Sequence, residues 1–183
     1  MKLTRLLATA SLCFASFGAS ADPITQIAPQ TSESQVFAFS FDGLSRSFIG
    51  GGTLTFHARG DYTASFSGKA DPTEVAYGSA EGIDFGVLGF DDATTRTAYG
   101  FDDNEWSIAF SLSHEDLVAL LADGILNVSM RLDDDVNLFF PDSAYAGVSF
   151  DYTPAAEVPE PASLALFGLA LAGIGAARRR KQK

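Results

Sequence analysis

The sequence predicts an all-β fold, an antiparallel β-sandwich of about seven to nine strands with one short helix. Apolar and polar residues alternate in five stretches, as expected of strands that bury one face and expose the other. These stretches are 37–41, 53–57, 108–112, 126–132 and 148–152. Clusters of Gly, Asp and Asn separate them and favour tight turns, and Gly50-Gly51-Gly52 is one such predicted turn. The 16 phenylalanines supply the apolar volume that a packed core requires.

One stretch departs from this alternation and predicts the helix, at residues 113–121. Ser113 is suited to cap its first turn, and Asp116 stands three residues later as the acidic partner of a capping box. The apolar residues that share one helical face are Leu117, Leu120 and Leu121. The pair Asp123-Gly124 ends the helix, because glycine readily adopts the conformation that terminates helices.

The first 21 residues have the pattern of a cleaved export signal. Lys2 and Arg5 precede a short apolar run, and Ala19 and Ala21 flank the predicted cleavage site. The pattern predicts passage through the Sec export machinery. Cys13, the only cysteine, lies in this segment, so we expect the mature chain to contain neither a disulfide nor a thiolate metal site.

The remainder of the chain divides by composition into a lead-in, a domain and a linker. A polar, flexible lead-in covers 22–34, the β-sandwich domain 35–152, and the linker 153–157. From Asp22 to Glu157 there are 22 acidic residues and five basic ones. This excess of negative charge repels phosphate backbones, so we expect no binding of nucleic acid.

The C-terminal segment 158–183 has three consecutive parts. It begins with Val158, Pro159, Glu160 and Pro161, continues with an uncharged run at 162–177, and ends with Arg178, Arg179, Arg180 and Lys181. The prolines hold the first part extended and accessible. As a helix the uncharged run would be about 24 Å long, which predicts a short transmembrane-type helix. The basic cluster acts as a stop on the cytoplasmic side of the inner membrane.

This order of motif, apolar helix and basic cluster resembles the PEP-CTERM sorting domain. The resemblance implies processing near the Pro-Glu-Pro motif by an exosortase in a Gram-negative bacterium with an exopolysaccharide or biofilm programme. It also implies an inner-membrane intermediate, followed by the cell surface or the extracellular matrix. The tail is elsewhere described as an ice-binding protein C-terminal domain, a description that carries no evidence of ice binding.

The strand pattern of the middle domain is similar to jelly-roll modules of the galactose-binding-like type. The similarity extends over about 100 residues of alternating pattern, and it includes no diagnostic motif. It implies a jelly-roll-like order of strands in two sheets.

A calcium site is the one metal site that the sequence suggests. Asp133, Asp134, Asp135 and Asn137 concentrate oxygen ligands in one loop, and Asp61 is a further candidate. The spacing differs from that of an EF-hand loop. The alternative interpretation is a solvated turn in an acidic exported protein.

No catalytic set is recognisable, so we expect a protein that is not an enzyme. The two histidines, His57 and His114, have surface contexts, and neither a Gly-x-Ser-x-Gly nor a His-Glu-x-x-His motif occurs. Trp106 is expected in the core. The predicted function is a non-catalytic adhesion or exopolysaccharide-binding module. The alternatives are a secreted carbohydrate-active hydrolase and an ice-binding protein. Ice binding would need regularly repeated Thr-x-Thr motifs, of which Thr53-Leu54-Thr55 is one instance.

Overall fold

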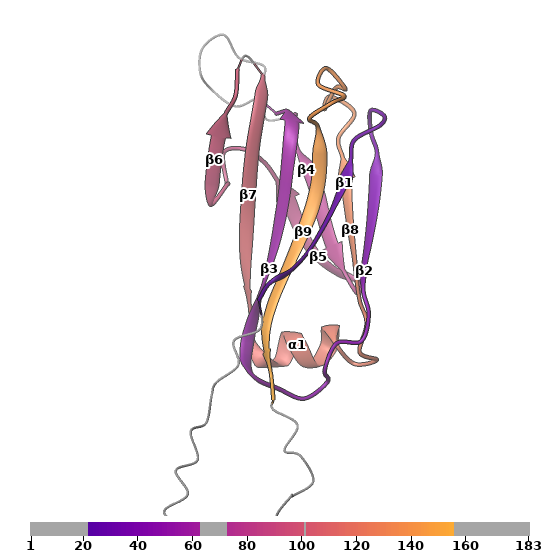
Figure 1. Ribbon diagram of the computed structural model, residues 1–183, viewed down its shortest axis with the longest axis vertical. Helices are drawn as coiled ribbons and strands as arrows, with labels where there is room; N and C mark the ends of the chain where they lie inside the picture. Colours follow the sequence, from indigo (N-terminus) through magenta and orange to yellow (C-terminus); the bar gives the residue numbers. More distant parts are fainter. Residues whose placement is uncertain (1–21, 63–72, 101, 156–183) are drawn as a thin grey trace, which may run out of the picture.

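The architecture comes from a computed structural model, which describes residues 22–62, 73–100 and 102–155 (Figure 1). Nine strands and one helix occur within these ranges. In chain order they are β1 (Ile24–Pro29), β2 (Val36–Phe41), β3 (Phe48–Asp61), β4 (Ala76–Ala80), β5 (Ile83–Leu88), β6 (Thr95–Ala98), β7 (Asp103–Leu112), α1 (His114–Leu120), β8 (Leu126–Leu132) and β9 (Tyr145–Pro154).

The strands form two antiparallel sheets, with the orders β1-β9-β3-β7-β6 and β2-β8-β4-β5. Pairing is nested along the chain, because β1 pairs with β9, β2 with β8, β3 with β7, and β4 with β5. Without the short edge strand β6, this is the strand order of a double Greek key. The predicted pair of antiparallel sheets and the single short helix are confirmed.

Inward-facing side chains of the two sheets form one apolar layer, and the predicted alternation is confirmed there. Residues with at most 4% exposure include Phe37, Phe39, Phe41, Leu54, Phe56, Trp106, Leu126, Val128, Met130, Val148 and Phe150. Phe56 lies near Phe85 and Phe110, with ring centroids 5.6 and 5.9 Å away. Gly78 makes room for its ring, because a Cβ there would stand 2.8 Å from Phe56 Cζ. This close packing fixes how the sheets stack.

The predicted turn at residues 50–52 is wrong, because β3 continues through it as a β-bulge. The register between β3 and β9 shifts between Ile49 and Gly52. A Cβ at Gly51 would stand 2.1 Å from the carbonyl oxygen of Leu112, so the neighbouring strand admits only glycine there. The glycines bend one long strand instead of separating two.

The boundaries predicted for the domain are also corrected. Residues 24–29 of the expected lead-in form edge strand β1, which pairs with β9. Pro29 is tolerated because an edge strand leaves one row of backbone groups unpaired. At the other end β9 runs to Pro154, two residues into the predicted linker.

The helix α1 begins with the capping box that the sequence predicts. Asp116 N donates to Ser113 Oγ at 3.2 Å, and Ser113 N donates to Asp116 Oδ2 at 2.8 Å. Hydrogen bonding of the Asp116 carboxylate with the side chain and backbone of Ser113 lowers the pKa of Asp116. Leu117, Leu120 and Leu121 are buried, so the helix closes one end of the apolar layer.

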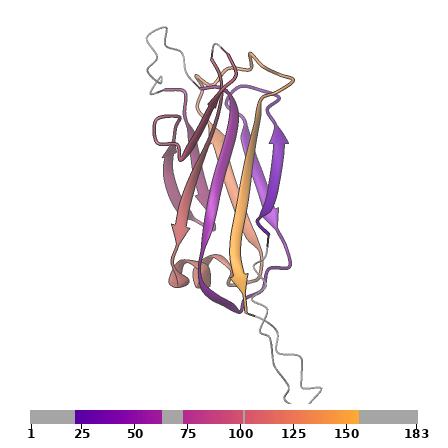
Figure 2. The same cartoon turned by 60° about the vertical axis from the view of Figure 1, so that its left-hand side comes forward.

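Both ends of the described domain leave the sandwich at the end that α1 closes (Figures 1 and 2). The export signal at 1–21 and the transmembrane-type helix at 162–177 lie outside the described residues. Within the described ranges, no helix has the length and apolar character needed to cross a membrane. The opposite end of the sandwich therefore points away from the attachment of the C-terminal segment.

Replacing Phe56 by alanine should lower the free energy of unfolding by about 3–5 kcal/mol, because it leaves a cavity beside Phe85 and Phe110. Ile49→Ala on the same strand is the control, since Ile49 is 64% exposed and should change stability by less than about 0.5 kcal/mol. Urea denaturation of the full chain measures both. Equal losses for the two variants would contradict this description of the core.

Candidate ligand-binding site

The outer face of the four-stranded sheet contains a hollow of about 410 Å³. Strands β2, β8 and β4 and the turn after β4 line it. We call this feature the sheet hollow. Its outward-facing lining residues are Ala38, Ser40, Ser79, Glu81, Gly82, Asn127 and Ser129. The same alternation that buries Phe39 and Val128 turns these residues outward.

Strand register places the small residues of the hollow in one row. Ala38 lies opposite Ser129 on one side of β8, and Ser79 lies opposite Ser129 on the other. The row crosses three strands, or about 10 Å at the usual strand spacing. No described residue forms a hydrogen bond with the hydroxyl of Ser79 or Ser129. Both hydroxyls are therefore available to a ligand.

One wall of the sheet hollow is a hydrogen-bonded set of polar side chains. Glu81 Oε1 accepts from Asn127 N at 2.7 Å and from Asn127 Nδ2 at 2.9 Å. Ser40 Oγ donates to Asn127 Oδ1 at 2.9 Å. These bonds hold Asn127 between two neighbours and fix its orientation.

Glu81 and Gly82 form the tight turn between β4 and β5. Their φ values are +46° and +82°, which match a two-residue hairpin of the type favoured by twisted strands. Positive φ is uncommon for glutamate. The bonds from Asn127 to the Glu81 carboxylate compensate for this conformation and hold the carboxylate beside the hollow.

The next row of the sheet, beyond the opposite side of the hollow, carries an arginine and a tyrosine. Arg131 Cζ stands 4.2 Å from the centroid of the Tyr77 ring. Tyr77 Oη donates to Asp133 Oδ2 at 2.9 Å, and this bond raises the pKa of Tyr77. Arg131 is therefore held against an aromatic ring at the boundary of the hollow.

The outer face of the five-stranded sheet also carries hydroxyls, but several bond to one another. Thr25 and Ser149 are 2.8 Å apart, and Thr95 and Ser107 are 2.6 Å apart. His57 Nε2 stands 2.7 Å from Ser149 Oγ, and burial lowers the pKa of this half-buried histidine. This face therefore offers a ligand fewer open groups than the sheet hollow.

The same outer face carries two Thr-x-Thr pairs, and they lie in strands that are not neighbours. Thr53 and Thr55 belong to β3, whereas Thr95 and Thr97 belong to β6, and β7 lies between them. A regular array of Thr-x-Thr pairs on adjacent strands is therefore not formed by these residues.

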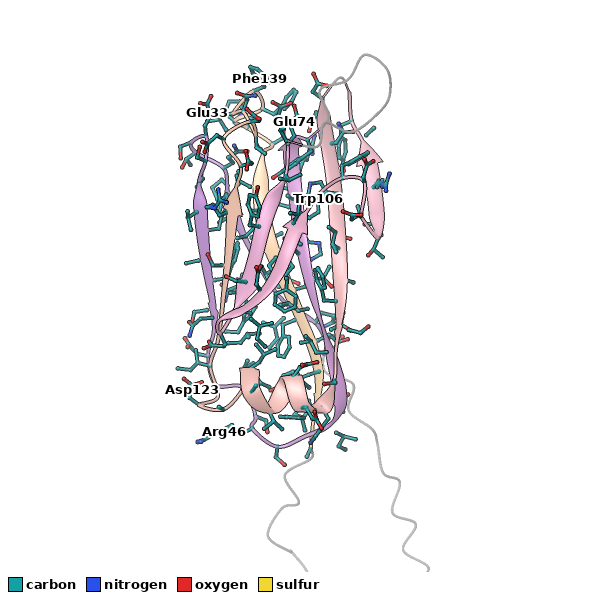
Figure 3. The ribbon with its side chains drawn as sticks, turned by 180° about the vertical axis from the view of Figure 1, so that it is seen from behind. Glu33, Arg46, Glu74, Trp106, Asp123 and Phe139 are labelled. Carbon is teal, nitrogen blue, oxygen red and sulfur yellow. The ribbon has the colours of Figure 1, made fainter. Side chains whose placement is uncertain are left out.

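The predicted calcium ligands lie in the loop after β8, at the end of the sandwich opposite α1. Figure 3 places Glu33, Glu74 and Phe139 at this end, and Arg46 and Asp123 near α1. The loop side chains turn to different neighbours. Asp133 accepts from Tyr77, Asp134 Oδ1 accepts from Ser34 Oγ at 2.6 Å, and Asn137 Nδ2 donates to Asp61 Oδ2 at 3.0 Å.

The expected proximity of Asp61 and this loop is thus present, through Asn137. Asp135 is exposed, and its carbonyl oxygen accepts from Asn137 Nδ2 at 2.9 Å. In the part of the chain that the structure describes, no group of three or more His, Cys, Asp or Glu side chains is placed to hold a metal ion. Calcium binding by Asp133, Asp134, Asp135 and Asn137 stays a prediction.

Comparison with known proteins identifies the C-terminal segment. The PEP-CTERM protein-sorting motif matches residues 157–181. This chain carries an exosortase sorting motif. The motif indicates an exported protein that an exosortase sorts across the membrane toward the cell surface. No curated protein and no solved structure matches the chain, so the resemblance to galactose-binding-like modules has no support from known structures.

The residues of the two terminal signals lie outside the described ranges. They are Ala19 and Ala21 at the predicted cleavage site, Val158, Pro159, Glu160 and Pro161 of the motif, and the basic residues Arg178, Arg179, Arg180 and Lys181.

Sequence reasoning did not find the sheet hollow. Its residues come from three strands whose register is a long-range property, so local alternation could show only that Asn127 and Ser129 face outward. The pair Glu81-Gly82 between two short strands was an available indication of a tight hairpin.

A melting scan of the full chain tests the calcium prediction. If the loop after β8 binds calcium, a tenfold excess over the dissociation constant should raise the melting temperature by about 5 °C relative to chelator. Asp135→Asn should reduce this rise, whereas Asp123→Asn at the α1 end should not. Identical melting temperatures with millimolar calcium and with chelator would contradict calcium binding by this loop.

Proposed function

We propose that the chain is an exported, non-catalytic module that binds exopolysaccharide at the cell surface or in the extracellular matrix. The observation that carries the proposal is the sheet hollow, whose lining combines apolar surface with hydroxyl, amide and carboxylate groups. Sugar hydroxyls both donate and accept hydrogen bonds, and the hollow offers both kinds of partner. The sorting motif at 157–181 supports the location, because exported polysaccharide is met outside the membrane.

The arrangement of the chain ends supports the same proposal. The described domain ends at the α1 side, and the sorting segment follows immediately in sequence. A domain held by that segment presents its sides and its far end to the surroundings. In the proposed route the Sec machinery exports the chain, and cleavage near Ala19 and Ala21 then removes the signal. An inner-membrane intermediate precedes processing by the exosortase.

The acidic character of the domain defines which partners it avoids. Between Asp22 and Glu157, 22 acidic residues outnumber five basic ones. This charge keeps the domain soluble in a matrix and repels polyanions such as nucleic acid. Attachment to polysaccharide must then depend on hydrogen bonds and contact area, not on attraction between opposite charges.

Deletion of residues 158–183 should change where the mature protein accumulates. The shortened chain lacks both the motif that the exosortase recognises and the apolar segment that enters the membrane. Fractionation of cells and medium measures this. A matched control replaces Arg46, which lies at the α1 end of the described domain, by alanine and should leave trafficking unchanged.

Mass spectrometry of the exported product from cells with and without the exosortase extends this test. In cells with the enzyme, the mature product should lack Arg178 to Lys183. The same intact tail in both strains would argue against processing.

Binding without turnover distinguishes the module from a secreted hydrolase. The full chain in detergent micelles should retain soluble polysaccharide in affinity electrophoresis, and prolonged incubation should release no new reducing ends. Release of reducing ends would favour the carbohydrate-active hydrolase. Thermal hysteresis without polysaccharide binding would favour the ice-binding alternative.

A further inference from the structure

We infer that the sheet hollow takes an uncharged polysaccharide strand that lies across β2, β8 and β4. This inference rests on the proposed function and deepens it, because it names the class of sugar and the direction of the strand. Three features of the described residues carry it: the shape of the hollow, its open hydrogen-bonding groups, and the charge at its boundaries.

The shape follows from side-chain size in successive rows of the sheet. The middle row consists of Ala38, Ser129 and Ser79, which are small and lie opposite one another across the strands. On one side stand Ser40, Asn127 and Glu81, and on the other side stand Arg131 and Tyr77. Rows of the same face are about 7 Å apart along a strand. A trough between higher walls therefore crosses the strands, and an extended chain of sugars fits along it.

Hydrogen-bonding capacity favours a polyhydroxylated ligand. The hydroxyls of Ser79 and Ser129 have no partner among the described residues, so each can donate one bond and accept others. Glu81 Oε1 accepts both hydrogen bonds from Asn127, and none of the described residues donates to Glu81 Oε2. A ligand that supplies hydroxyl donors to Oε2 and acceptors to the serines would satisfy this set without displacing an internal bond.

Charge decides between neutral and acidic polysaccharides. Glu81 places a carboxylate at one wall, and the outward-facing neighbour of Ser79 on the adjacent strand β5 is Asp84. The cation nearest the trough in the register, Arg131, stacks on Tyr77, which itself donates to Asp133. An acidic sugar would meet repulsion from two carboxylates, Glu81 at one wall and Asp84 beside Ser79, against a single cation, Arg131, at the other wall. The geometry therefore favours sugars without a carboxylate or sulfate.

The other outer face lacks this combination, which makes it a suitable control surface. On the five-stranded sheet, Thr25 bonds Ser149 and Thr95 bonds Ser107. Ser111 of β7 is exposed on that face and lies opposite Thr53 of β3. A substitution at Ser111 can match one in the hollow in residue type and strand context.

The test uses the full chain in detergent micelles, with dextran as the neutral probe and alginate as the uronate probe. Native protein should bind dextran at least about tenfold more tightly than alginate. Ser129→Trp and Ser79→Trp should each weaken dextran binding by about tenfold or more, because the indole fills the trough. Ser111→Trp should leave dextran binding unchanged. Circular dichroism melting of all three variants checks that each is folded.

A gain-of-binding variant makes the result independent of any folding defect. Glu81→Gln keeps an acceptor for Asn127 but removes the negative charge, so alginate binding should strengthen by about threefold while dextran binding stays the same. Dextran binding that both folded tryptophan variants leave intact, or tighter binding of alginate than of dextran, would overturn this inference and leave the proposed function standing. Failure of native protein to bind any polysaccharide would overturn both.

Discussion

A single apolar layer between two sheets holds this molecule together, and everything on its surface depends on that layer. The chain has one cysteine, so no intramolecular disulfide can share the task. Strand β3 is central to the layer, because it pairs with both β7 and β9 and carries Leu54, Phe56 and Ala58, all fully buried. The helix α1 closes one end of the same layer with Leu117 and Leu120.

The packing of the apolar layer also determines which residues lie on the outer faces of the sheets. In β8 the buried residues Val128 and Met130 alternate with Asn127 and Ser129, which face outward. Because β2 and β4 pair on either side of β8, packing of the core fixes the register that assembles the sheet hollow. A slip of one residue in β8 would turn its serine and asparagine inward and dismantle both the core and the hollow.

Local sequence pattern predicted much of this and failed where long-range pairing decides. Alternation identified the buried phenylalanines of β2, and the capping box at Ser113 identified the helix. Edge strand β1 was missed because it buries little of its apolar surface, and only Ala28 among its apolar residues packs on the core. The glycines around Gly51 were predicted to form a turn, but they form a bulge. Glycine is required there because the carbonyl oxygen of Leu112 on a neighbouring strand leaves no room for a Cβ. The hollow required the register of β2, β8 and β4, which no local pattern contains.

The most direct measurement of the central claim is a site-specific fluorescence titration. In a Cys13→Ser background the chain has no other cysteine, so Ser129→Cys places one environment-sensitive fluorophore in the sheet hollow. Addition of dextran should shift its emission in a saturable way, while the same label at Ser111→Cys on the opposite sheet should not respond. A saturable response at position 111, with none at position 129, would contradict the account.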